Sequence, residues 1–226
     1  IVAALPTLAQ FNKTLPPGII FNGKFSATKA NFKAVGYMDL IDLDAVYGAT
    51  DATITFNNAF AFDYDNSNGV SAGKIDFETV AAHEIGHALG FISAVDGVDL
   101  MKDGGIAGET FITPLDLFRF RDGVVGQDPT TLAEFTSFPR FLDTGGAAIF
   151  DDLLTETALG TGTLTGDGDE ASHWKNDDLT GQLLGVMDGS LYSGEIHPIT
   201  AADIRSLDLI GYHYVASVPE PASALL

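Results

Sequence analysis

The segment DFETVAAHEIGHALG, residues 76–90, constrains the fold of this chain more than any other part of the sequence. Asp76 is a residue type that caps the amino terminus of a helix, and Gly90 is the type that ends a helix in a left-handed conformation. We therefore predict a helix between these two residues. Apolar residues recur along it at helical spacing, which predicts a buried stripe of Ala81, Ile85, Ala88, Leu89 and Ile92.

Two histidines share a different face of this predicted helix. His83 and His87 lie four residues apart, so both imidazoles can reach one metal ion. Glu84 lies too close to them to be a comfortable third ligand, but it is well placed to accept a proton from a metal-bound water. The chain has no cysteines, so His, Asp or Glu side chains must hold any metal. The pattern predicts a zinc site with Glu84 as the general base.

A catalytic zinc site needs a third protein ligand, and the sequence offers several. In one large group of zinc proteases a third histidine follows the helix, at the position that Ser93 holds here. Asp96 and Asp99 follow shortly afterwards, whereas Glu109 lies in a stretch without helical periodicity. The remaining candidate is the remote His173. The residues alone leave the choice among these side chains open.

HEIGHALGF, followed much later by SHWKNDDLTGQLLGVMDG at residues 172–189, resembles the leishmanolysin-type metzincins. In that family an insertion displaces the third histidine, which reappears in a His-Trp pair with a methionine a little over ten residues further on. The glycine after the second histidine marks a turn below the metal, and the methionine lies under the site. The matching residues here are the ligands His83, His87 and His173, the catalytic base Glu84, the turn glycine Gly90 and the methionine Met187.

The resemblance implies an α+β fold in which a twisted sheet lies above the active-site helix. A β-rich and loop-rich insertion, residues 91–172, would precede the third ligand. The implied function is that of a zinc-dependent metalloendopeptidase, in which a zinc-bound water attacks the peptide bond and Glu84 accepts its proton. Protein or peptide substrates would lie antiparallel along an edge strand. The chain departs from the family in lacking the cysteines of eukaryotic members and in having Gly189 where some other metzincins have a zinc-binding tyrosine.

Two other functions remain open on the sequence. The first is that of a different zincin hydrolase, whose third ligand would be Asp96 or Glu109. The second is that of a non-catalytic surface or matrix protein with a structural metal. A structural zinc site is closed by a fourth protein ligand and would have no need of Glu84. The number of protein ligands at the metal therefore separates an enzyme from a structural protein.

Length, charge and hydropathy narrow the classes of partner. A chain of 226 residues predicts one domain, which we place at residues 1–215. The formal net charge of -20 repels nucleic acid and anionic lipid. No stretch reaches the ~18 consecutive apolar residues of a membrane-spanning helix, so no membrane insertion is expected. The end SVPEPASALL predicts a disordered tail at residues 216–226, which resembles the start of a PEP-CTERM sorting signal. We therefore expect an exported bacterial protein, extracellular or at the cell surface.

Three further elements follow from the local pattern. Residues 26–36 predict a short helix that begins at Ser26 or Thr28, and residues 200–211 predict a final helix. Alternating apolar residues at 53–64 predict a strand with a turn or bulge near its middle.

Oxygen-rich side chains gather in two loops, residues 62–69 and 165–170. Their composition suits Ca²⁺, although neither segment has the spacing of an EF-hand. They are the calcium candidates of the sequence. His197 and His213 belong to no ligand pattern, and we expect them to be structural or exposed.

Overall fold

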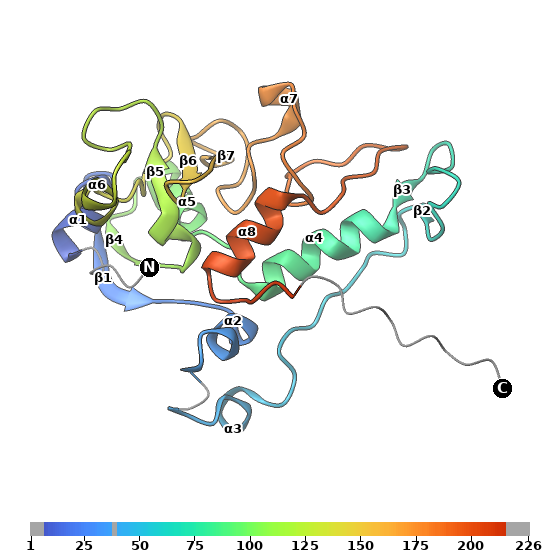
Figure 1. Ribbon diagram of the computed structural model, residues 1–226, viewed down its shortest axis with the longest axis horizontal. Coiled ribbons are helices and arrows are strands. Elements are labelled where there is room, and N and C mark those ends of the chain that lie inside the picture. Colours follow the sequence, from blue (N-terminus) through green and yellow to red (C-terminus); the bar gives the residue numbers. More distant parts are fainter. Residues whose placement is uncertain (1–6, 38–39, 216–226) are drawn as a thin grey trace.

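The computed structural model describes residues 7–37 and 40–215, which form a mixed α and β structure (Figure 1). The predicted tail at 216–226 lies outside the described residues. The helices are α1 (Leu8–Asn12), α2 (Lys29–Ala34), α3 (Leu43–Tyr47), α4 (Phe77–Leu89), α5 (Val95–Asp103), η2 (Leu115–Phe118), α6 (Leu132–Ser137), α7 (Asp177–Thr180) and α8 (Ala201–Leu209). The strands are β1 (Ile19–Phe25), β2 (Phe62–Asp63), β3 (Ile75–Asp76), β4 (Gly108–Ile112), β5 (Arg119–Arg121), β6 (Ala148–Asp151) and β7 (Glu156–Leu159).

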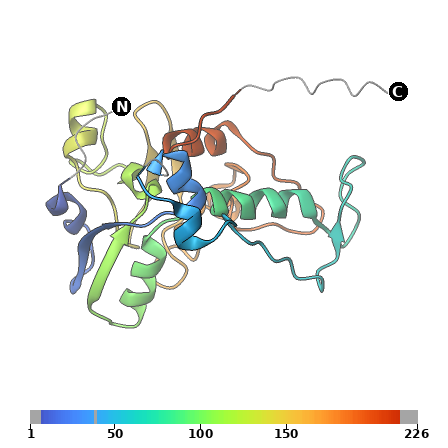
Figure 2. The same ribbon diagram turned by 90° about the horizontal axis from the view of Figure 1, so that it is seen from below.

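The strands of the described ranges form three small sheets. β1 pairs with β4 and β2 pairs with β3, both in parallel, whereas β5, β6 and β7 form an antiparallel sheet. The expectation of a mixed α and β structure is confirmed. The single twisted sheet expected above the active-site helix is instead these three separate sheets. β2 and β3 lie at the amino end of α4, and the other strands lie towards its carboxyl end (Figures 1 and 2).

Of the strand predicted at residues 53–64 only β2 is present, whereas the turn predicted near its middle is confirmed. The amide of Phe60 donates a hydrogen bond to the carbonyl of Asn57 (3.3 Å), and this turn interrupts the extended chain. The alternating aromatic side chains do lie together, as their spacing predicts. They pack on Phe77 at the start of α4, with ring centroids of Phe56 and Tyr64 each 4.9 Å from it. The aromatic side chains of this segment are therefore packed on a helix residue, while its backbone pairs with β3 only at β2.

The prediction of a helix at residues 76–90 is confirmed by α4. Asp76 caps it, because its carboxylate accepts hydrogen bonds from the amide (3.0 Å) and hydroxyl (2.7 Å) of Thr79. Gly90 ends the helix with φ at 112°, a left-handed conformation that favours glycine. The predicted buried stripe is wrong, since Ile85 is 48% exposed. The small residues Thr79 and Gly86 are the buried ones, because neighbouring segments approach that face closely.

The two other predicted helices are also present. Thr28 caps α2 and accepts a hydrogen bond from the amide of Asn31 (3.1 Å). α8 begins after Thr200, whose side chain forms a capping box with Asp203. α8 lies beside α4 (Figure 1), and the hydroxyl of Tyr212 donates to the carbonyl of Leu89 (2.8 Å). None of the helices in the described ranges is long and apolar enough to cross a bilayer.

The predicted insertion, residues 91–172, contains three helices, α5, η2 and α6, as well as β4 to β7. Its two ends meet, because the amide of Ser93 donates to the hydroxyl of Ser172 (2.8 Å). It also supplies much of the largest apolar core. The buried members of that core are Phe91, Leu115, Phe141, Ala148, Phe150, Leu159, Trp174, Val186, Met187 and Ile210. The segment is therefore an integral part of the described structure and not an appendage on its surface.

Candidate metal centre

Three imidazoles converge beside α4. The Nε2 atoms of His83 and His87 are 3.0 Å apart, and those of His87 and His173 are 3.1 Å apart. The Nε2 atoms of His173 and His83 complete the triangle at 3.2 Å. Tetrahedral zinc with Zn–N bonds of ~2.0–2.1 Å holds its nitrogens ~3.3 Å apart. The structure thus brings together the three histidines named from the sequence, with the spacing that such an ion requires.

The hydrogen bonds of the ring nitrogens determine which tautomer is present. Nδ1 of His83 lies 2.9 Å from the carbonyl of Val186, and Nδ1 of His87 lies 2.8 Å from that of Phe91. Because a carbonyl oxygen can only accept, each Nδ1 must carry the proton. Both Nε2 atoms then present bare lone pairs towards the centre. Lone pairs this close repel each other unless a cation lies among them, so the donor set fits a metal ion.

Burial favours the neutral form of two of these imidazoles, His83 and His173. It lowers the pKa of His83, and it lowers the pKa of His173 to about 3, with a smaller contribution from His87. The Nδ1 of His173 has no hydrogen-bond partner among the described residues, and the carboxylate of Glu170 lies 3.9 Å away. At neutral pH His83 and His173 are therefore in the neutral form that binds a metal.

Glu84 lies between two cavities that flank α4. One, of about 440 Å³, is bounded by Glu84, His87 and residues of the extended segment 52–57. The other, of about 160 Å³, is bounded by His83, Glu84 and His197. Glu84 is partly buried, and it borders both spaces together with a histidine of the cluster. Its carboxylate is therefore accessible to a molecule bound next to the imidazoles.

Met187 lies directly against α4. A Cβ built on Gly86 would be 2.2 Å from the Sδ of Met187, so a glycine is required between the two helix histidines. Gly90 is similarly close to another segment, because its Cβ would lie 3.0 Å from the side chain of Asn31. Both residues that the resemblance singled out next to the ligands therefore lie in close contacts, Met187 against Gly86 of α4 and Gly90 against Asn31 of α2.

Buried polar contacts position the segments that carry His173 and Met187. The indole of Trp174 donates to Asp203 on α8 (2.7 Å), and the same carboxylate accepts from the amides of Val186 (3.0 Å) and Met187 (3.3 Å). The amide of Trp174 also donates to the carbonyl of Met187 (2.9 Å). Sequence analysis did not identify Asp203 as part of the centre. Its only signal was the capping position three residues after Thr200.

The other candidate third ligands lie away from the imidazoles. Ser93 donates its hydroxyl to Asp116 (2.6 Å). Asp96 accepts hydrogen bonds from the amide of Ala171 (2.6 Å) and the hydroxyl of Ser172, so it holds the segment just before His173. Glu109 is exposed on β4.

The carboxylate of Asp99 is also engaged in hydrogen bonds, which it accepts from the amides of Leu164 (2.8 Å) and Thr165 (2.8 Å). Position 189 has no room for a tyrosine, since a Cβ on Gly189 would be 2.4 Å from Asp169. Among the described residues, the histidine cluster therefore contains His83, His87 and His173 without a carboxylate.

In the two loops expected to suit calcium, the carboxylates form hydrogen bonds or ion pairs with nearby residues of the protein. Asp63 accepts from the amide of Ser71 (2.7 Å), and Asp65 from the hydroxyl of Ser67 (2.6 Å). In the second loop, Asp167 pairs with Lys175 (2.6 Å). In the described part of the chain, no three acidic groups from these loops lie together as potential ligands.

Of the remaining histidines, His197 is buried and His213 is exposed. This agrees with the expectation that they are structural or exposed. Comparisons of the chain with protein families, with curated proteins and with solved structures find no match.

Proposed function

We propose that the protein is a zinc-dependent metalloendopeptidase of the leishmanolysin-like metzincin type. The observation that carries the proposal is the convergence of the Nε2 atoms of His83, His87 and His173 within 3.0–3.2 Å of one another. Nitrogen ligands with tetrahedral spacing suit zinc, and they suit Ca²⁺ or Mg²⁺ poorly because those ions prefer oxygen. The sequence resemblance supports the same assignment through Gly90 and Met187.

A catalytic and not a structural role is supported by the ligand count. Catalytic zinc sites have three protein ligands and keep a further position open, whereas structural sites use four protein ligands. The cluster in the described residues contains three histidines. Glu84 adjoins this cluster and borders both flanking cavities, as a base would need to do. These observations favour an enzyme over the metal-binding surface protein left open by the sequence.

The residues around the cluster have separate roles in this proposal. Bound zinc would supply Lewis acidity and lower the pKa of a coordinated water to ~7. Glu84 accepts the proton from the attacking water and passes it to the leaving amine. The extended segment 52–57 lies along the larger cavity, where its backbone N–H and C=O groups can pair with a peptide as an added strand. Unfolded protein segments are therefore the substrate class that we propose.

Export from a bacterial cell is the remaining part of the proposal. It rests on the sequence alone, in the residues Pro219, Glu220 and Pro221 of SVPEPASALL. This resemblance to a sorting signal supports an extracellular or cell-surface location, where proteins and peptides are available as substrates.

Substitution of Glu84 tests the proposed activity. Glu84→Gln should keep one zinc per chain and the wild-type melting temperature but lose activity on unfolded casein by ~10²–10⁴-fold, because a general base is removed. Zinc content, thermal unfolding and casein hydrolysis would be measured together. The matched control is Glu109→Gln, which alters an exposed glutamate on β4 and should leave all three unchanged.

Results of two kinds, on the role of Glu84 and on the need for zinc, would contradict the proposal. One is near wild-type hydrolysis by Glu84→Gln, which would remove the glutamate from the reaction. The other is purified wild-type protein that binds no zinc, or casein hydrolysis that continues after zinc is removed. Loss of zinc in Glu84→Gln would instead make this residue a ligand and would equally overturn its assignment as the base.

A further inference from the structure

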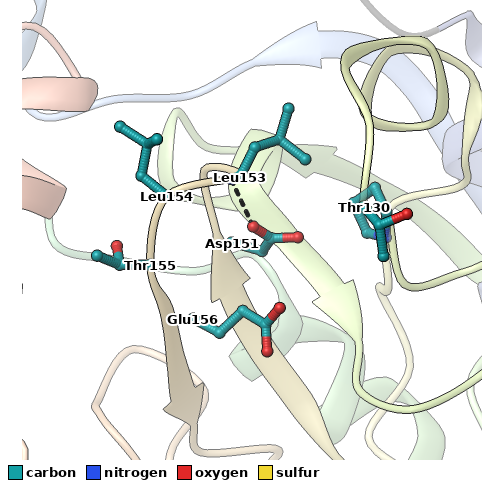
Figure 3. Close-up of a pocket in the computed structure, with 7 residues that line it drawn as sticks. Thr130, Asp151, Leu153, Leu154, Thr155 and Glu156 are labelled. Atoms are coloured by element: carbon teal, nitrogen blue, oxygen red, sulfur yellow. Dashed lines mark hydrogen bonds between the residues drawn. The ribbon is translucent and has the colours of Figure 1, made fainter.

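A second cluster of potential ligands lies at the turn of the β6–β7 hairpin. Asp151 ends β6 and pairs in register with Glu156, which begins β7. Asp128 joins them from the loop between β5 and α6, and one oxygen from each carboxylate lies within 4.8 Å of the others. The carboxylates of Asp151 and Glu156 point to the same side of the hairpin, towards Thr130 (Figure 3). Neither segment considered for calcium from the sequence contains these residues.

Two oxygens of this cluster are buried without a donor. Asp151 is 1% exposed, and its Oδ1 accepts from the amide of Leu153 (2.6 Å). Its Oδ2 has no hydrogen-bond partner among the described residues. Asp128 repeats the arrangement, because Oδ2 accepts from the amide of Gly123 (2.8 Å) while buried Oδ1 lacks a partner in the same ranges. Buried anionic oxygens are costly unless a donor or a cation satisfies them.

The surroundings add negative charge. The pKa of Asp151 is raised to about 6, mainly by burial and to a smaller extent by the nearby carboxylates of Glu156 and Asp128. Two positive groups of this region make their direct contacts with other partners, although Arg140 also interacts electrostatically with Asp151. Arg205 pairs with Asp152 (2.5 Å), and Arg140 donates to the backbone carbonyls of Phe135 (2.9 Å) and Phe138 (3.0 Å).

We propose that Asp128, Asp151 and Glu156 bind a calcium ion. The three side chains offer only hard oxygen ligands, which Ca²⁺ binds at ~2.3–2.6 Å, so oxygens around one ion lie up to ~5 Å apart. A cavity of about 380 Å³ beside Asp151 and Glu156 leaves room for the waters that would complete the coordination. The ion would attach the loop containing Asp128 to the hairpin. This inference does not depend on zinc or on peptidase activity.

Calcium titration of the zinc-loaded full chain, freed of other divalent ions, tests the site. Calorimetry should show one Ca²⁺ per chain with a Kd of ~10⁻⁴–10⁻³ M, the range of extracellular calcium modules. Calcium at ~100 Kd should raise the melting temperature by roughly 5 °C or more. His173→Ala, which alters only the other cluster, should keep this response.

Variants separate calcium binding from a structural role of the acidic cluster. Asp151→Asn should raise the melting temperature at pH 7 without calcium, since it removes a buried charge and keeps an acceptor for the amide of Leu153. It should also abolish the response to calcium, and Glu156→Gln should weaken binding at least ~10-fold. The control Asp122→Asn removes an exposed charge from the same loop as Asp128 and should change neither property.

The proposal is overturned if the wild-type chain shows no saturable calcium binding. It is equally overturned if Asp151→Asn responds to calcium as strongly as the wild type, because binding would then lie elsewhere. Equal stabilisation of the wild type by Mg²⁺ at the same concentration would overturn the assignment to calcium. Since each measurement reads binding or unfolding, its outcome is independent of the casein assay.

Discussion

At the scale of single residues, the position of the three imidazoles depends on side chains that lie outside the histidine cluster. Asp96 belongs to α5, which follows the helix of His83 and His87, but its carboxylate binds Ala171 and Ser172. These two residues precede His173 directly. Asp96 thus links the two ends of the insertion and positions the third imidazole. Supporting contacts of this kind typically change metal affinity ~10–100-fold when removed.

Removal of this carboxylate gives the prediction at this scale. Asp96→Ala should weaken zinc binding by roughly 10–100-fold, because the segment before His173 loses two hydrogen bonds. Zinc affinity would be measured by competition with a chromophoric chelator. At saturating zinc the variant should regain most of its casein hydrolysis, since Glu84 is unchanged. Asp103→Ala, at an exposed position at the end of the same helix, is the control and should bind zinc as the wild type does. An unchanged zinc affinity in Asp96→Ala would contradict the positioning role.

At the scale of elements, α4 packs against its neighbours through small residues that allow other segments to come close. It does not present a broad apolar face to the core. Gly86 lies against Met187, and Ile85 faces outward although it is the largest apolar residue of the HEIGH segment. A helix of this kind gains little from apolar burial along its length. Its position depends on its caps, Asp76 and Gly90, and on the segments that meet it at Gly86.

Two glycine substitutions test this packing. Gly86→Ala should lower the melting temperature, because overpacking against Met187 costs ~1–3 kcal/mol and exceeds the ~1 kcal/mol gained in helix propensity. Gly97→Ala is the matched change on α5, where a Cβ meets no atom within 4 Å. It should stabilise the protein by ~0.5–1 kcal/mol. Thermal unfolding of both variants provides the measurement. If Gly86→Ala were as stabilising as Gly97→Ala, the close contact at Met187 would be wrong.

At the scale of the whole molecule, the proposed zinc joins parts of the chain that are far apart in sequence. His87 and His173 are 86 residues apart, and the intervening segment supplies much of the core. A ligand that binds only the folded chain stabilises it according to its concentration and affinity. Zinc binding should therefore stabilise the fold as a whole and not only the metal centre.

Removal of zinc provides the corresponding prediction. A zinc-selective chelator, in buffer that contains calcium, should lower the melting temperature by roughly 5 °C or more if zinc was present at ~100 Kd. His173→Ala should already melt at the lower temperature and should not respond to the chelator. His213→Ala, which alters an exposed histidine, should behave as the wild type. An equal effect of the chelator on wild type and His173→Ala would show that the stabilising metal is not bound by His173.

Local sequence was sufficient to predict the helices α2, α4 and α8 and the placement of His83, Glu84 and His87. Helix caps and one-turn spacings involve residues within four positions of each other, so the residues themselves determine the geometry. Local sequence was not sufficient to predict the proposed third ligand. The residues alone left Asp96, Asp99, Glu109 and His173 open, and a family resemblance singled out the last of these.

Tertiary structure decided every feature that depends on distant segments. The exposure of Ile85, the aromatic cluster on Phe77 and the hydrogen bonds of Asp96 and Asp203 all depend on which segment packs alongside, and local periodicity carries no information on this. The Asp128–Asp151–Glu156 cluster is the clearest case. Its members are unremarkable in an acidic sequence, and they become potential ligands because a loop folds onto the turn of a hairpin and buries two of their oxygens without donors.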